Sequence, residues 1–170
     1  MLKRLLFCTV LLVSASGFRT NAADFVPFKA SWTGVTISAD PTGFPVVAVV
    51  SAGEGHGTQL GHFTMVTPHD SNVFTYELEG DHLFTAANGD TLTAHFVGQL
   101  TPTFGPGGPA GPPVLVSGVV PCTITGGTGR FQGATGSYDF AITAIPLADG
   151  SGFASTATMN GVISSVGSSH

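Results

Sequence analysis

Five histidines ahead of the C-terminal tail are the side chains of this sequence best suited to bind a metal ion or to transfer protons. They stand at positions 56, 62, 69, 82 and 95, and no two of them have the three- or four-residue spacing that places zinc ligands on one helix face. His56, His69 and His82 stand among glycine or aspartate residues, so we expect solvated side chains in turns. The alternative is a metal site assembled across strands. We predict no metal site and no cofactor.

Two short segments place a carboxylate beside an imidazole, Glu54-Gly55-His56 and Asp81-His82. General acid/base catalysis needs such groups within hydrogen-bond reach of the substrate proton. Direct neighbours in a strand point to opposite faces of the sheet, which separates Asp81 from His82. We therefore expect no acid/base pair at either segment, and we predict no catalytic residue.

Arg130 is the third candidate, because few basic side chains occur in this sequence. In one role its guanidinium binds backbone carbonyls or Asp139 and fixes its own loop. In the other it binds the carboxylate of a ligand, with Phe131 and Tyr138 as further ligand contacts. We favour the first role, because a loop-fixing arginine needs only local partners.

The segment that contains Arg130 is built from small residues around one aromatic ring. It is Gly126-Gly127-Thr128-Gly129-Arg130-Phe131-Gln132-Gly133-Ala134-Thr135-Gly136. The glycines predict a tight turn with close backbone approach, and we expect Phe131 to plug an apolar end of the core. A phosphate-binding loop is the competing interpretation. It requires Gly-Lys-Ser/Thr at the start of a helix, whereas residues 137–142 alternate like a strand.

The same segment resembles a family signature. Gly-Gly-Thr-Gly-x-Phe-x-x-Ala-x-Gly is similar to the motif before the last strands of plant dirigent proteins, and the form with Gly133 is also similar to allene oxide cyclase. Asn88-Gly89-Asp90-Thr91-Leu92, followed by Gly98, is similar to a second dirigent segment. The string Gly-Thr-Gly-Arg-Phe-x-Gly-Ala-Thr-Gly most closely resembles small secreted bacterial proteins. The resemblance implies an eight-stranded antiparallel barrel, and the family's catalytic residues lie outside the two matching segments.

Residues 1–23 have the pattern of an export signal. Lys3 and Arg4 precede a short apolar core, and small residues at 20–23 suit cleavage. A membrane anchor is the alternative, but the apolar stretch is shorter than the roughly 20 residues that span a bilayer. We predict a secreted or periplasmic protein, with residues 24–170 forming one domain that is not membrane-bound after cleavage.

Removal of the signal leaves a strongly acidic chain. Lys29 and Arg130 then face ten Asp and Glu residues, a formal charge of −8 with neutral histidines. Nucleic acids and anionic lipid surfaces require dense basic patches, so we exclude them as partners. Cys122 becomes the only cysteine, and we expect it to be buried as a small apolar residue.

The rest of the chain predicts short alternating strands divided by turns. Gly34 is expected to form a bulge that reverses the facing of Val35 and Ile37. Residues 46–50 are apolar on both faces, which motivates a hypothesis of homo-oligomers formed through this strand. Turns are expected at 51–57, 68–72 and 80–81, with a strand at 74–78 between the last two.

Three features are predicted in the second half of the chain. Asn88-Gly89 between alternating runs predicts a hairpin, with Leu92, Ala94 and Phe96 on one face of the second strand. The Pro/Gly-rich segment 102–113 predicts an irregular loop or flap. Pro121 predicts an edge or bulge in the strand that leads to the glycine-rich segment.

Eight or so antiparallel strands without a helix in the mature chain predict an all-β protein, a single antiparallel eight-stranded β-barrel. A closed barrel leaves no strand edge open, whereas alternation alone also fits a sandwich. We expect a non-catalytic binding protein for a small apolar or aromatic molecule. The alternatives are a cyclase-like or coupling-guiding enzyme of the resembling families, and a structural surface protein with a filled barrel. The volume of the barrel interior discriminates among them.

Overall fold

A computed structural model describes residues 24–164 of the chain; the predicted export signal at 1–23 lies outside them. The described part consists of nine antiparallel strands and three short 3-10 turns. The strands are β1 (Phe25–Asp40), β2 (Val46–Gly57), β3 (Gly61–Asn72), β4 (Glu77–Ala86), β5 (Thr91–Gln99), β6 (Thr101–Phe104), β7 (Pro113–Gly127), β8 (Gly136–Pro146) and β9 (Phe153–Ser164). The 3-10 turns are η1 (Pro41–Gly43), η2 (Gly108–Ala110) and η3 (Gly129–Phe131). No helix in this part is long and apolar enough to cross a membrane.

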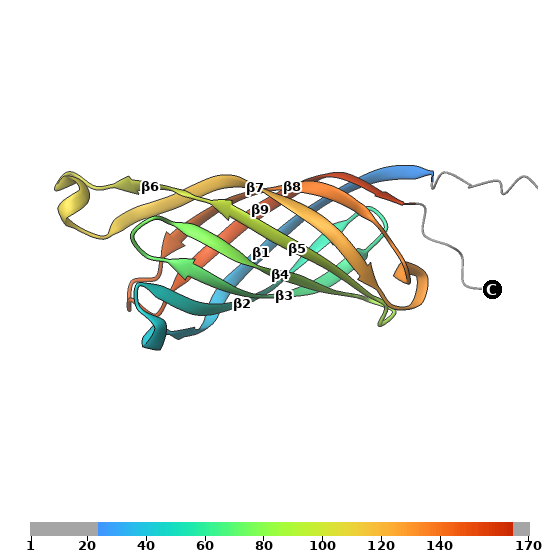
Figure 1. Cartoon of the computed structure of the whole chain (residues 1–170), viewed down its shortest axis with the longest axis horizontal. Helices are drawn as coiled ribbons and strands as arrows, with labels where there is room; N and C mark the ends of the chain where they lie inside the picture. The colour runs from blue at the N-terminus through green and yellow to red at the C-terminus, as the bar shows by residue number, and fades with distance from the viewer. Residues whose placement is uncertain (1–23, 165–170) are drawn as a thin grey trace, which may run out of the picture.

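Eight of the strands close into an antiparallel barrel. The strand order is β5-β4-β3-β2-β1-β9-β8-β7, and a further pairing of β5 with β7 completes the ring. The ninth strand, β6, pairs only with the start of β7 and extends from one end of the barrel as an arm (Figure 1). The predicted eight-stranded barrel is therefore confirmed, and the sandwich alternative is wrong.

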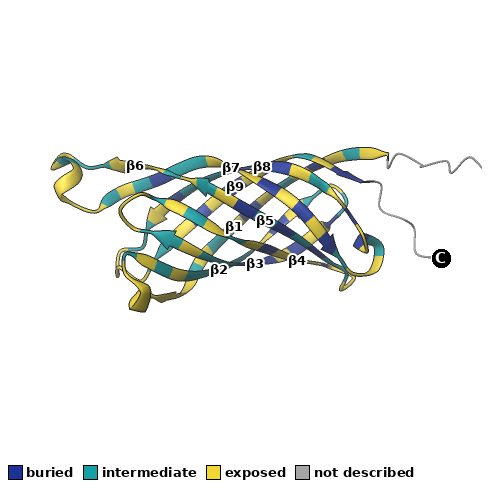
Figure 2. Cartoon of the chain, viewed as in Figure 1, coloured by how far each residue is buried: buried dark blue, intermediate teal, exposed yellow. Residues whose placement is uncertain are grey.

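Alternation along the strands places the apolar side chains inside the barrel. In β5, Leu92, Ala94 and Phe96 are buried, whereas Thr93 and His95 face outward and are partly exposed. This pattern recurs around the ring, so that dark and light segments alternate along each ribbon in Figure 2. The alternation follows from the two-residue period of a strand, and in β5 it confirms the predicted facing of the side chains.

Three predicted turns are wrong, because β2, β3 and β4 run through them. The turns lie instead at residues 58–60 and 73–76, and the predicted strand at 74–78 is mostly turn. Glycines in β2 serve close packing rather than chain reversal. A Cβ at Gly55 would overlap the carbonyl oxygen of Ser31 and lie 2.6 Å from the ring of Phe63. Interstrand hydrogen bonds thus override the local turn propensity of glycine and aspartate.

The predicted bulge at Gly34 is also wrong. The register with β2 is regular at Gly34 and shifts only between Thr36 and Ser38. Val35 and Ile37 consequently face outward, with 43% and 60% of their surface exposed. Gly34 faces inward, where a Cβ would overlap the indole ring of Trp32. Glycine at this position makes room for the tryptophan.

The Pro/Gly-rich segment 102–113 is more ordered than predicted. Its first residues form β6, which pairs with the start of β7, so only 105–112 lack strand structure. Two other predictions in this half are confirmed. The Asn88-Gly89 segment closes the β4–β5 hairpin, and the pairing of β5 with β7 ends at Cys122, next to Pro121. Proline has no N–H to continue that ladder.

Candidate functional site

The two ends of the barrel interior differ. The end that carries the glycine-rich segment is filled by large side chains with no exposed surface, among them Phe28, Phe63, Phe84, Leu92 and Phe131. Their rings pack edge to face or tilted, for example Phe63 against Phe84 at 5.4 Å between centroids. This end is a closed hydrophobic core, and the prediction that Phe131 plugs it is confirmed.

The other end holds a cavity of about 290 Å³. Most of its lining is apolar, and neither a carboxylate nor a basic Lys or Arg side chain is part of it. The polar lining groups come from inward-facing positions of several strands. They include Trp32 of β1, Thr67 and His69 of β3, and His82 of β4. The rings of Phe96 and Phe140 also line the cavity.

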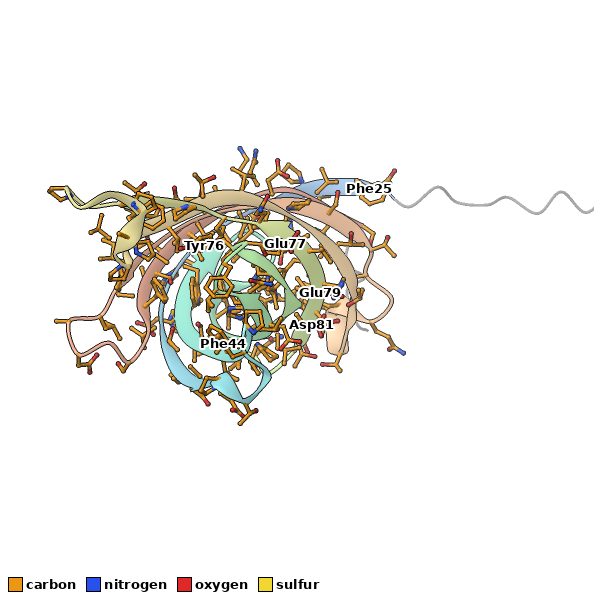
Figure 3. All side chains as sticks on the ribbon, turned by 60° about the vertical axis from the view of Figure 1, so that its left-hand side comes forward. Phe25, Phe44, Tyr76, Glu77, Glu79 and Asp81 are labelled. Carbon is orange, nitrogen blue, oxygen red and sulfur yellow. The ribbon has the colours of Figure 1, made fainter. Side chains whose placement is uncertain are left out.

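Two exposed aromatic side chains lie beside the β3–β4 turn, whose residues Val73 and Tyr76 line the cavity. Phe44 follows η1 and Phe74 lies in the β3–β4 turn, with their rings edge to face at 5.3 Å and more than 60% of each residue exposed. Tyr76, in the same turn, lines the cavity and adopts a positive φ of 58°. Figure 3 turns this end toward the viewer, with Phe44 and Tyr76 at the mouth and Glu79 and Asp81 on the outer wall.

His82 is buried at the bottom of the cavity, so the prediction of a solvated turn histidine is wrong. Its Nδ1 lies 2.7 Å from Oη of Tyr138, and its ring packs 4.6 Å from Phe96 and 4.5 Å from Phe140. Burial, reinforced by the nearby His69, lowers the pKa of His82 to about 3. The imidazole is therefore neutral at physiological pH.

His69 is the second histidine that was wrongly predicted to lie in a solvated turn. It lines the cavity from β3, with its ring 6.2 Å from Phe96, and its Nδ1 lies 3.1 Å from the carbonyl oxygen of Thr67. Burial lowers the pKa of His69, against a smaller opposing effect of the hydrogen bond. Both cavity histidines are thus uncharged hydrogen-bonding groups.

Two buried polar atoms on lining residues have no hydrogen-bond partner within residues 24–164. They are Nε1 of Trp32 and Oγ1 of Thr67. An unsatisfied buried donor or acceptor costs about 1–3 kcal/mol, so native proteins rarely keep one without a reason. A partner that is not part of the folded chain is one such reason.

Cys122 is buried, as predicted, and it lies beside His82. Its Sγ is 3.9 Å from Nδ1 of His82 and 3.5 Å from the carbonyl oxygen of Val120. Burial raises the pKa of the thiol to about 12, so the thiolate needed for nucleophilic attack does not form. Cys122 contributes packing rather than chemistry.

None of the three predicted ligand contacts lines the cavity. Arg130 and Phe131 stand at the closed end, outside the cavity lining, and the Arg130 guanidinium lies 4.9 Å from the Phe131 ring. Tyr138 reaches the site indirectly, through its bond to His82. Their role in binding stays a prediction.

Arg130 lies near Asp90 rather than the Asp139 named in the prediction. Its Nε is 3.6 Å from Oδ2 of Asp90, and its backbone N–H donates to the same oxygen at 3.3 Å. Asp90 therefore joins the β4–β5 hairpin to the glycine-rich segment.

The small residues of the glycine-rich segment allow tight turns and close packing. Positive φ angles occur at Gly126, Gly129, Gly133 and Gly136. Gly127 lies against the backbone of Thr91, the Thr128 hydroxyl accepts a hydrogen bond from the Thr91 N–H, and Ala134 is buried.

The other three histidines of residues 24–164, His56, His62 and His95, lie on the outer wall. His62 is 3.5 Å from Glu54, and His95 is 3.1 Å from Asp81, so neither of the two sequence-adjacent pairs meets. Within residues 24–164, no group of three or more His, Cys, Asp or Glu side chains is arranged to hold a metal ion.

Sequence reasoning missed the cavity histidines because it ended one strand before His69 and began the next strand after His82. His69 continues the inward series Phe63, Met65 and Thr67, and His82 begins the inward series completed by Phe84 and Ala86. Extending the two-residue alternation by one step would have placed both side chains inside.

The fold and the site define a small all-β barrel with one filled end and one mainly apolar cavity. No family model matches the chain, and no curated protein matches it. Among solved structures, the chain is similar to that of a pterocarpan synthase dirigent protein, with 15% identity, a TM-score of 0.43, and coverage of 86% of this chain and 88% of that chain. The barrel described above is defined by its own strand pairings.

Proposed function

We propose that the protein binds a small, largely apolar molecule in the cavity at the open end of the barrel. The observation that carries the proposal is a mainly apolar space of about 290 Å³ whose lining residues include His69, His82 and Trp32. Ligand pockets combine an apolar lining with a few polar groups that orient the ligand in this way.

The filled end of the barrel argues against a purely structural role. Phenylalanine, leucine and methionine side chains leave no comparable space there, so this chain can pack a barrel interior completely. The inward positions of the other end include small residues instead, such as Ser51, Ala144 and Ser155. Small side chains at these positions preserve the cavity.

Filling the cavity tests the proposal. Ala144→Phe adds an inward ring to the lining, and Ala154→Phe adds the same ring at an exposed position on the neighbouring strand. We expect the native chain and A154F to bind the neutral probe N-phenyl-1-naphthylamine, detected by its fluorescence, and A144F to lose that binding. Equal binding by A144F and A154F would place the probe elsewhere and contradict the proposal.

A second candidate is an isomerase or coupling-guiding protein similar to allene oxide cyclase or dirigent proteins. The observation that favours it is the hydrogen bond between Tyr138 and His82, which places two titratable groups beneath an apolar cavity. The test is native mass spectrometry of protein from its own host, followed by incubation of the released molecule with fresh protein. Recovery of the molecule unchanged favours binding alone, and conversion favours the second candidate.

We further propose that the protein is exported after cleavage near residue 23, consistent with the secreted bacterial proteins that its loop motif resembles. The intact mass of protein purified from its host tests this proposal. A mass that includes residues 1–23 in the extracellular or periplasmic fraction would contradict cleavage.

A further inference from the structure

The two cavity histidines present hydrogen-bonding atoms of opposite kind. A carbonyl oxygen only accepts, so Nδ1 of His69 carries the proton that it donates to the Thr67 carbonyl at 3.1 Å. A neutral imidazole has one protonated nitrogen. Nε2 of His69 is therefore a hydrogen-bond acceptor.

His82 has the reverse arrangement. Tyr138 Oη lies 2.7 Å from its Nδ1, and a phenol is a stronger donor than an imidazole N–H, whereas an imidazole nitrogen is the stronger acceptor. Tyr138 therefore donates to Nδ1, and Nε2 of His82 carries the ring proton. The neighbouring Cys122 Sγ, 3.9 Å from Nδ1, is a weak partner and does not change this assignment.

Both histidines line the same cavity and pack against the same ring. Their centroids lie 6.2 Å and 4.6 Å from that of Phe96. A hydroxyl oxygen is the simplest single atom that accepts one hydrogen bond and donates another.

Building on the proposed function, we propose that the ligand is an uncharged molecule with an apolar skeleton and a hydroxyl group, which accepts a hydrogen bond from His82 and donates one to His69. A carboxylate would meet the lone pair of His69 Nε2, and no Lys or Arg side chain lines the cavity to balance its charge. A ketone satisfies the His82 donor but leaves the His69 acceptor without a partner.

Four ligands with one compact skeleton test this inference: adamantane, 2-adamantanone, 1-adamantanol and 1-adamantanecarboxylate at pH 7.5. Trp32 is the only tryptophan of the chain and lines the cavity, so its fluorescence reports binding of these compounds. We expect 1-adamantanol to bind at least about fivefold more tightly than adamantane, as one net hydrogen bond allows, and the carboxylate to bind most weakly.

His69→Phe removes the acceptor, with His95→Phe on the outer wall as the matched control. H69F should bind adamantane as the native chain does but lose the preference for 1-adamantanol, and H95F should keep it. Equal affinities across the native series, or tightest binding of the carboxylate, would overturn the hydroxyl assignment and leave the proposed binding function intact. Absence of binding by all four would overturn both. The native series decides the question even if H69F does not fold.

Discussion

At the scale of single residues, the burial of His82 links the stability of the barrel to pH. The pKa of His82 is about 3 in the folded chain and 6.5 in water, so the unfolded chain binds more protons between these values. Stability contributed by the neutral ring is complete above pH 6.5 and is lost as the pH falls toward 3. His69, whose pKa is also lowered by burial, acts in the same direction, while Cys122 and Tyr138 stay protonated.

His82→Phe should reduce this dependence. Between pH 6.5 and 5 we expect the free energy of unfolding of H82F to fall less steeply than that of the native chain, by about 1 kcal/mol per pH unit. Urea denaturation at pH 7, 6 and 5 measures the slope. The unpaired Tyr138 hydroxyl lowers the stability of H82F equally at every pH. His95→Gln, at an exposed ion pair, is the control, and an unchanged slope in H82F would contradict the buried neutral histidine.

Asp90 and Arg130 give a second prediction at this scale, because they hold the hairpin against the glycine-rich segment. Asp90 accepts hydrogen bonds from the Arg130 backbone and the Asn88 side chain, whereas the Arg130 guanidinium lies 3.6 Å away and is partly exposed. We expect D90A to cost about 1–2 kcal/mol and R130M less than about 1 kcal/mol. Urea denaturation measures the loss in the free energy of unfolding for both variants. A larger loss in R130M than in D90A would show that the guanidinium is the main link between the hairpin and the glycine-rich segment.

At the scale of elements, glycines inside strands mark places where neighbouring strands of the barrel pack closely. Gly55→Ala places a methyl group against the Ser31 carbonyl and the Phe63 ring, so we expect a loss of about 1–3 kcal/mol in the free energy of unfolding. Gly43→Ala is the control, because a Cβ there has no atom within 4 Å. Denaturant titration of both variants measures the difference. Equal stability of G55A and the native chain would contradict the close packing.

The elements that sequence alone predicted best are those whose signal is local. The Asn88-Gly89 hairpin and the alternation of Leu92, Ala94 and Phe96 each depend on a few adjacent residues. The ends of β2, β3 and β4 depend on pairing with the preceding and following strands, which joins residues well separated in sequence, such as Ala30 with Gly57 and Val46 with Asn72. Glycine and aspartate within 51–57 and 80–81 favour turns locally, but those bonds hold them in strands.

At the scale of the whole molecule, the barrel could be predicted but its cavity could not. Closure follows from many alternating strands that must leave no edge open. A cavity depends on how side chains from all strands fill one volume, which no local pattern records. Trp32, His69 and His82 come from three strands, and only closure of the ring brings them to one site.

The outer wall carries an apolar row that is visible only in the assembled barrel. Strand register aligns one outward residue from each of six consecutive strands, from β8 through β9, β1, β2 and β3 to β4. The row is Ile145, Ala154, Val35, Ala52, Val66 and Leu83. Its large members are each about 40–54% exposed. By contrast, Ala48 in the 46–50 segment lies between Asp40 and Asp70, which makes that segment less suitable for apolar contact.

Self-association through β2 should therefore centre on this row rather than on 46–50. We expect size-exclusion chromatography with light scattering to show an oligomer that Val66→Lys dissociates, because the lysine charge would be buried between copies. Ala48→Lys, placed between two carboxylates, should leave the oligomer intact, as should Thr123→Lys on the opposite wall. Dissociation by A48K but not V66K would return the interface to residues 46–50. A native chain that is monomeric at all concentrations would remove the hypothesis.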